Sequence, residues 1–197
     1  MLNKCPVLDK GFVATLNISL CDRRLAEIAQ ELKIDKSKLL PLASAAFVIK
    51  APLFILINLA AADIKTVIGG NDGMEVYIPD ISEIGVDDLS DKKAMAYHLK
   101  TTTEALLLSI KGLIIDGCDR FVAQTIAPVS TYATFIASAS VPVWQEFCKQ
   151  KTNHWQLEQY RAAIAGIMDV EWTTKESNCE AIEPQGKEGQ STTTKET

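Results

Sequence analysis

A long apolar stretch, residues 39–62, constrains the fold of this chain more than any other feature. It reads LLPLASAAFVIKAPLFILINLAAA and contains Lys50 and two prolines. A charge at mid-span is costly in a bilayer, and prolines interrupt the helix that would have to cross it. We therefore predict no membrane span. Instead we predict a buried strand over residues 44–49 and a helix over residues 52–62 that is apolar on all sides and therefore central and buried.

Composition places the chain among soluble globular proteins. Of its 197 residues, 47% are hydrophobic and 23% charged, which suits one domain with a real core. The formal net charge is -5, from 20 Lys+Arg against 25 Asp+Glu, and no basic cluster occurs. This balance argues against a general nucleic-acid binder.

Cysteine and histidine usage bears on the compartment and on metal binding. The five cysteines are odd in number and form no C-x-x-C pair, which favours a reducing compartment over a disulfide framework. No secretory signal opens the chain, so we expect a cytoplasmic protein. With only His98 and His154 present, no clustered Cys/His set is available, and we expect no metal site.

The remaining pattern predicts strands early and helices late, which is an α+β fold with a small mixed or antiparallel sheet and a helical bundle. A strand is expected over residues 12–18 after a turn at 9–11, and a helix is expected after an N-cap at Asp22. Met74–Ile78 is predicted as a short strand closed by Pro79.

Ser90 is the predicted N-cap of a long helix that ends near Asp116, with Gly117 just beyond it. Its expected apolar side consists of Met95, His98, Leu99, Leu106, Ile110 and Leu113. Four more helical segments are predicted: from Asp119 to near Pro128, after Ser130, from Pro142, and from an Asn153 cap to about Val170.

The last part of the chain differs in composition. Residues 173–197 contain almost no large apolar side chain, which predicts a disordered polar tail on a domain of residues 1–172. Such a tail is a possible docking segment for a protein partner.

Six segments, in order, resemble those of flavin-dependent thymidylate synthases. They cover most of residues 4–170, and the longest, GCDRFVAQTIAPVSTYATF, is similar without gaps to that family's G-x-x-x-E-x-A-R-x-x-L-P-x-x-x-Y-T segment. The segments are PVLDKGFV (6–13), FVIKAPLF (47–54), YIP (77–79), residues 117–135, VWQEF (143–147) and HWQLE (154–158).

The resemblance implies a homotetramer whose active sites are shared between subunits. It also implies FAD, dUMP, a methylene-tetrahydrofolate and NADPH as ligands, with reduced flavin carrying the methylene group and hydride to the uracil ring. In such an enzyme the cofactor supplies the chemistry, and the protein supplies orientation and anion binding.

The anion-binding residues of that family are replaced here. The R-H-R signature corresponds to Ala61-Ala62-Asp63, on what reads as a shortened loop, with Thr66 in place of the first Ser and Gly69 in place of the Glu. E-x-A-R corresponds to residues 121–124, so that Gln124 replaces the phosphate-binding Arg, and N-A-R corresponds to Ser140-Val141-Pro142. Guanidinium forks are the usual way to hold such phosphates, and these replacements remove them.

At a few positions this sequence has a polar side chain where the family has a binding residue. Each of these side chains also has a structural interpretation. By the resemblance, the candidates for cofactor binding are Asn58, Thr66, Ser140 and Gln156, and the candidates for substrate binding are Gln124 and Lys151. Asn58 is equally explained by a hydrogen bond to a backbone carbonyl, and Lys151 by exposure at a helix end. Lys50 is expected either to extend its ammonium group to solvent or to pair with a carboxylate, rather than to act as a base. Trp144, Trp155 and Trp172 are expected in the core or at an interface.

The sequence thus predicts a catalytically degenerate homologue that serves as an oligomeric structural or interaction module, with a tetramer as the expected state and with no catalytic residue and no cofactor. Two alternatives remain open. One is an active FAD-dependent thymidylate synthase with a rebuilt site. The other is a nucleotide or flavin binder without turnover.

Overall fold

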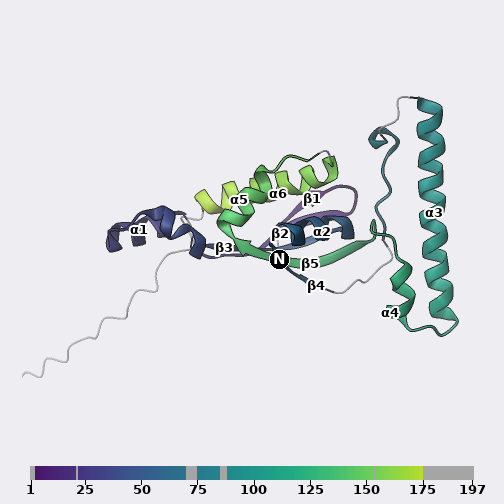
Figure 1. The fold of residues 1–197 in the computed structure, drawn as a ribbon, viewed down its shortest axis with the longest axis horizontal. Coiled ribbons are helices and arrows are strands. Elements are labelled where there is room, and N and C mark those ends of the chain that lie inside the picture. Colours follow the sequence, from purple (N-terminus) through teal and green to yellow (C-terminus); the bar gives the residue numbers. More distant parts are fainter. Residues whose placement is uncertain (1–2, 21, 70–74, 85–87, 153, 175–197) are drawn as a thin grey trace, which may run out of the picture.

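A computed structural model describes residues 3–20, 22–69, 75–84, 88–152 and 154–174 of the chain. Within these ranges the structure is an antiparallel sheet of five strands with helices packed against it (Figure 1). The strands are β1 (Lys4–Val7), β2 (Gly11–Ile18), β3 (Ser44–Pro52), β4 (Lys65–Ile68) and β5 (Tyr132–Ser140). They lie in the order β1-β2-β3-β5-β4, which confirms the predicted α+β class.

The three long strands owe their register to alternating side chains. Val13 of β2 pairs with Ile49 of β3, and Ile49 pairs with Phe135 of β5. All three are fully buried and face the same layer of the core. A slip of one residue would turn every one of these side chains to the opposite face, so the apolar row fixes the pairing.

Four helices, α1 (Asp22–Leu32), α2 (Leu53–Ala61), α5 (Val141–Lys149) and α6 (Trp155–Thr174), contribute residues to this core. Trp144 of α5 is its largest fully buried side chain. Its ring meets the edge of Phe47 at a centroid distance of 5.0 Å, and its Nε1 donates to the carbonyl of Ala45 at 3.0 Å. The expected core role of Trp144 is therefore confirmed.

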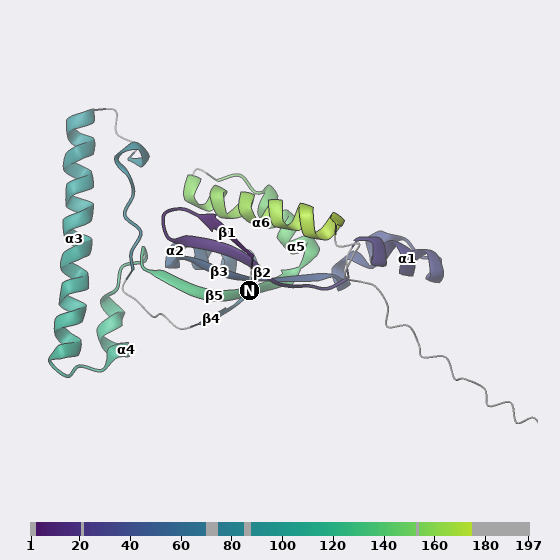
Figure 2. The same cartoon turned by 180° about the vertical axis from the view of Figure 1, so that it is seen from behind.

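Several elements lie at the two ends of the sheet (Figures 1 and 2). At one end stands α1 (Asp22–Leu32), followed by the short 3-10 helices η1 (Lys36–Lys38) and η2 (Leu40–Leu42). At the other end stand α3 (Leu89–Ile115) and α4 (Arg120–Ala123), with η3 (Ile81–Glu83) and η4 (Gln124–Ile126).

The segment after Ser130 is a strand, so the prediction of a helix there was wrong. In β5 the residues Ala133, Phe135 and Ala137 are buried while the intervening side chains are more exposed, which is the period of a strand. Alanine and serine are abundant in this segment and carry no strong strand signal by themselves. The pairing with β3 and β4 decides its conformation.

The predicted central burial of the 52–62 helix holds for only one side of α2. Ile55 and Leu59 are fully buried, but Ile57 is 59% exposed. The helix lies on the surface of the sheet, so the opposite side faces outward in the single chain.

The long helix α3 also differs from its prediction. Its N-cap is Asp88, whose carboxylate accepts from the backbone N–H of Ser90 at 2.7 Å, so Ser90 is not the cap. Of its predicted apolar side only Ile110 is buried, whereas Met95, His98, Leu99 and Leu113 are exposed. The end of the helix is as predicted, because Asp116 is the C-cap and Gly117 follows with a φ of 91°.

Two short segments were interpreted wrongly. The segment after α2 is not all loop, since β4 occupies part of it and pairs with β5. The predicted strand at 74–78 contributes only a single bridge, between Val76 and Thr131, in its described part. The predicted cap at Asn153 and the tail from residue 175 onward lie outside the described residues, and α6 runs to Thr174, two residues beyond the predicted domain end.

We expect Trp144→Ala to lower the free energy of unfolding by about 3–5 kcal/mol, because it removes a fully buried ring and leaves the Ala45 carbonyl without its donor. Urea denaturation followed by circular dichroism measures the change. Leu42→Ala is the matched control, since Leu42 is 66% exposed and its loss should cost less than about 0.5 kcal/mol. Equal midpoints for the two variants would contradict the core assignment.

Candidate functional site

A cavity of about 410 Å³, called here the central cavity, lies between α2, residues 77–79, α3 and the start of α6. Apolar side chains such as Phe54, Leu99 and Leu157 form much of its wall. Among its described lining residues there is no lysine or arginine, and the single ionisable side chain besides Tyr77 is the exposed His154. The cavity is therefore suited to uncharged groups.

Two of the predicted site residues, Asn58 and Gln156, meet in this cavity. The Asn58 Nδ2 donates to the carbonyl of Phe54 at 2.8 Å, one turn earlier on α2. This is the backbone role that the sequence offered as the structural interpretation, and it leaves the amide oxygen as the atom able to take a ligand. Gln156 forms a side-chain hydrogen bond with Tyr77.

Tyr77 divides the central cavity from a second one and is held from both sides. Its hydroxyl donates to the carboxylate of Glu83, in addition to the bond with Gln156. Burial, with the carboxylate of Glu83 adding to it, raises the pKa of Tyr77 well above its ordinary value. The phenol therefore stays neutral, and its hydroxyl remains a hydrogen-bonding group in a fixed position.

The second cavity, of about 620 Å³, lies on the other side of residues 77–79 and carries negative charge. Asp9, Asp80 and Glu83 line it, against the single cation Lys100. Asp9 accepts from the hydroxyl of Tyr132, and Asp80 accepts from the backbone N–H of Ser82 at 3.0 Å. The bond from Ser82 lowers the pKa of Asp80, which keeps it ionised.

The side chains that line these two cavities do not supply the positive charge that holds a phosphate-bearing ligand. Phosphates are held by guanidinium and ammonium groups or by backbone N–H groups at helix starts, as charge-assisted hydrogen bonds. The central cavity has no such cation among its described lining residues, and carboxylates outnumber the one lysine in the neighbouring cavity.

The other predicted site residues are scattered over the subunit. Thr66 lies on β4 opposite Ala137, and Ser140 lies opposite Ser44 at the end of β5. Gln124 begins η4, directly after α4, whereas Lys151 lies between α5 and α6. None of the four lines either cavity. Within one chain the structure therefore joins Asn58 and Gln156 alone among the six candidates.

Two other charged side chains have structural partners. Lys50 pairs with Glu75, which is one of the two interpretations that the sequence offered. Arg161 was missed: it is 5% exposed, donates to the carbonyl and side chain of Gln150 at the C-cap of α5, and lies 4.8 Å from the ring centroid of Phe147. Its spacing of three residues from Glu158, with which it pairs at 3.4 Å, was the available signal.

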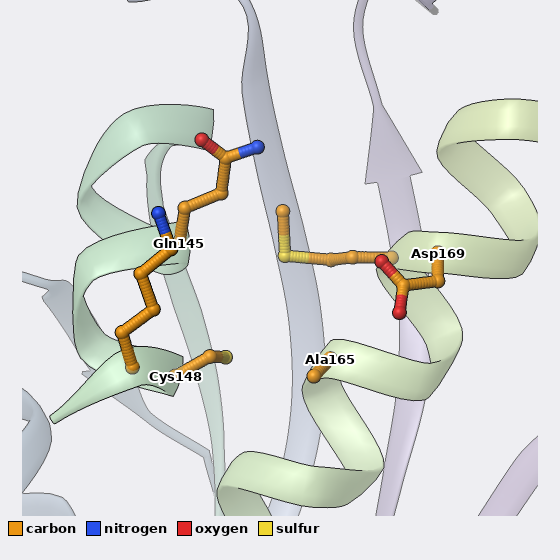
Figure 3. Close-up of a pocket in the computed structure, with 6 residues that line it drawn as sticks. Gln145, Cys148, Ala165 and Asp169 are labelled. Carbon is orange, nitrogen blue, oxygen red and sulfur yellow. The ribbon is translucent and has the colours of Figure 1, made fainter. Parts of the chain in front are cut away.

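A third cavity, of about 330 Å³, separates α5 from α6. In Figure 3, Gln145 and Cys148 of α5 face Ala165 and Asp169 of α6 across it. Burial raises the pKa of the Cys148 thiol to about 11. A thiol that stays protonated is a poor nucleophile, so this cavity lacks the activated cysteine that covalent catalysis would need.

Comparison with known proteins bears on the fold. No family model matches the chain, and no curated protein matches it. Among solved structures, the UMP/dUMP methylase PolB from Streptomyces cacaoi bound with 5-Br UMP matches with a TM-score of 0.69 at 15% identity, over 85% of this chain and 92% of that one. PolB bound with 5-Br dUMP matches with a TM-score of 0.63 at 15% identity, over 85% and 93%.

These matches show that the chain shares the fold of a UMP/dUMP methylase. At 15% identity they establish the fold alone. Within the described residues, no group of His, Cys, Asp and Glu could hold a metal ion, and none of the helices is long and apolar enough to cross a membrane.

We expect Cys148 to react slowly with iodoacetamide at pH 8, because a pKa of about 11 leaves roughly one thiol in a thousand ionised there. In a variant with serine at Cys5, Cys21, Cys118 and Cys179, the rate of alkylation should rise about tenfold per pH unit up to pH 10. Mass spectrometry of the alkylated protein follows the reaction, and full denaturation in urea is the control that restores an ordinary rate. A rate that levels off near pH 8.5 would contradict the assignment.

Proposed function

We propose that this protein is a catalytically degenerate relative of pyrimidine-nucleotide methylases that serves as an oligomeric structural or interaction module. The observation that carries the proposal is the uncharged central cavity inside a fold shared with a UMP/dUMP methylase. The neighbour PolB is described as bound with 5-Br UMP, a nucleotide that carries a phosphate. An enzyme acting on such an anion needs preorganised positive charge.

The binding free energy that is lost with the charged hydrogen-bond donors supports the absence of catalysis. A hydrogen bond to a charged group is worth roughly 1.5–3 kcal/mol, so losing two of them weakens an anionic ligand by about 3–6 kcal/mol. That range corresponds to roughly a hundredfold to a ten-thousandfold in affinity. The carboxylates of Asp9, Asp80 and Glu83 next to the central cavity add repulsion rather than compensation.

Assembly is the second half of the proposal. The outward side of α2 and several large apolar side chains of α3, among them Tyr97, Leu108 and Ile115, are exposed in the single chain. Large exposed apolar surfaces mark interaction sites in soluble proteins. We propose that copies of the chain cover these surfaces in a homo-oligomer, with a tetramer as the expected state and the C-terminal segment as a further docking segment.

One observation favours a second function, the binding of a ligand without turnover. The central cavity combines apolar walls with neutral polar groups, including the free amide oxygen of Asn58 and the side chain of Gln156. Such a lining suits an uncharged ring with amide groups better than a nucleotide. The three described cysteines, Cys5, Cys118 and Cys148, are free thiols, in keeping with the proposed cytoplasmic location.

We expect no formation of dTMP from dUMP. The test is tritium release from labelled dUMP with FAD, NADPH and methylene-tetrahydrofolate supplied, together with the absorbance of the purified protein near 450 nm. We expect release equal to the blank without enzyme and a colourless protein. Gln124→Arg should not restore activity, because one guanidinium does not replace several.

An active flavin-dependent thymidylate synthase serves as the positive control in the same assay. Release above the blank that is lost in Lys151→Ala would contradict the degenerate assignment and support an enzyme with a rebuilt site. Saturable binding of uridine or riboflavin without release of tritium would support the second function, ligand binding without turnover.

We expect light scattering to give a mass near four times the 21.6 kDa of one chain. The charged variant Leu108→Glu should lower this mass, because Leu108 is 67% exposed on α3 in the single chain. Leu42→Glu is the control, since Leu42 is equally exposed but lies at the other end of the sheet. A monodisperse monomer for the unmodified protein would contradict the assembly half of the proposal.

A further inference from the structure

The cavity between α5 and α6, called here the α5–α6 cavity, is separate from the other two. Its volume is about 330 Å³, and it shares no lining residue with the central cavity or the acidic one. A ligand held in it would therefore bind independently of whatever the central cavity binds. The described lining consists of Gln145, Cys148 and Lys149 of α5 and Ala165, Met168 and Asp169 of α6.

The buried part of this lining is apolar and contains sulfur. Met168 is 6% exposed and belongs to the hydrophobic core, and Cys148 packs against that core. Because burial raises the pKa of the Cys148 thiol to about 11, the thiol stays protonated and behaves as a small apolar group. Ala165, which faces Cys148 across the cavity in Figure 3, is small and leaves room between the helices. These three side chains form a surface for an aliphatic or thioether group.

Two opposite charges lie at the exposed part of the lining, one on each helix. Lys149 is in the last turn of α5 and Asp169 is on α6, and both residues are exposed. Figure 3 shows Asp169 across the cavity from Gln145 and Cys148. Its carboxylate acts on the thiol, because it adds to the rise in the Cys148 pKa that burial causes. The cavity therefore presents an ammonium group, a carboxylate and the amide of Gln145 together.

Arg161 brings a further positive charge close to the same thiol. It lies one turn before Ala165 on α6, and while burial raises the pKa of Cys148, the charge of Arg161 lowers it. Its Nη atoms donate to Gln150 and Glu158, but its buried Nε has no hydrogen-bond partner in the described part of the chain. A buried N–H without an acceptor is uncommon. This side of the cavity therefore suits a ligand that brings an acceptor oxygen.

We propose that the α5–α6 cavity binds a small zwitterion with an apolar tail, of the class of free α-amino acids with an aliphatic or thioether side chain. Lys149 binds the carboxylate of the ligand, and Asp169 accepts from its ammonium group. The apolar tail lies against Met168, Ala165 and Cys148. This site goes beyond the proposed function and does not depend on it.

Charge and size select this class of ligand. An anion without an ammonium group would be repelled by Asp169, and a cation without a carboxylate would be repelled by Lys149 and Arg161. A neutral molecule would shield both charges from water without pairing with either, which is costly. At ~30 Å³ for each water molecule, 330 Å³ holds roughly eleven of them. That room suits an amino acid of the size of leucine or methionine and excludes a flavin dinucleotide.

The test is isothermal titration calorimetry of the full chain with L-leucine and L-methionine. We expect saturable binding of both amino acids. Three probes should bind at least tenfold more weakly than L-leucine: glycine, which lacks the tail, isoamylamine, which lacks the carboxylate, and isocaproate, which lacks the ammonium group. Each of them loses one of the three contacts that the cavity offers.

Substitutions assign the binding to this cavity. Lys149→Gln and Asp169→Asn should each weaken L-leucine binding at least tenfold, because each removes a charge-assisted hydrogen bond. Ala165→Leu should abolish binding by filling the cavity, with an unchanged circular dichroism spectrum. Lys38→Gln and Glu146→Gln are the matched controls, since both residues are exposed and neither lines the cavity. Both controls should keep the parent affinity.

Alkylation of Cys148 provides a second measurement. In the variant with serine at the other cysteines, saturating L-leucine should slow alkylation of Cys148 at least threefold, whereas glycine should not. Absence of saturable binding would overturn the inference, and so would equal affinity for isocaproate or unchanged affinity in both Lys149→Gln and Asp169→Asn. Binding that appears only after residues 175–197 are removed would also overturn it, because that segment would then be the occupant. Turnover of dUMP and the mass of the assembly are measured separately, so failure here leaves the proposed function standing.

Discussion

The central strand β3 is the element on which the rest of the structure depends. It pairs along its whole length with β5, and β2 pairs with its other edge. Its carbonyls also anchor two helices, since Ala45 accepts from Trp144 of α5 and Lys50 accepts from Tyr160 of α6 at 2.9 Å. The chain then passes directly from β3 into α2 at Pro52. One strand thus fixes the sheet, the helical layer and one wall of the central cavity.

This dependence explains a constraint on the first hairpin. A Cβ atom at Gly11 would lie 2.1 Å from the hydroxyl of Tyr160 and 2.8 Å from the carbonyl of Lys50, so no side chain fits there. Glycine is required at this point by the close approach of α6 to the sheet rather than by a left-handed backbone. The same contact brings the hairpin turn, with Asp9, to the edge of the acidic second cavity.

Under the proposed function, the scaffold of this protein is kept while the chemistry of the site is lost. Packing around Trp144 and Tyr160 preserves a methylase-like fold at 15% identity, while the cavity between α2 and α6 holds neutral groups. Packing tolerates many apolar substitutions as long as volume and pattern are kept. Phosphate binding has no such tolerance, because a guanidinium has no neutral equivalent. The proposed function therefore combines a retained fold with the loss of phosphate binding.

The apolar side chains left outside the core include a group on α3, such as Leu108 and Ile115, and a group on the sheet, such as Val67 and Ile136. Both are products of the same architecture, since helices cover one side of the sheet and α3 stands at its end. In a chain with a net charge of -5, such surfaces are liabilities unless something covers them. In the proposed function, interfaces between copies cover these surfaces, because each copy brings the matching surface.

The sequence by itself determined the class of fold, the strand over residues 44–49, the end of the long helix at Gly117, and that Lys50 would either reach solvent or pair with a carboxylate. These follow from local pattern, capping and the cost of an unpaired charge, which are properties of neighbouring residues. The tertiary structure alone decided that the Ala- and Ser-rich segment after Ser130 is a strand, and that Leu99 and Leu113 face outward. It also decided that Asn58 and Gln156 meet while Gln124 and Lys151 lie apart. These outcomes depend on which surfaces pack against one another. The periodicity of a single segment does not show which other segments it will pack against.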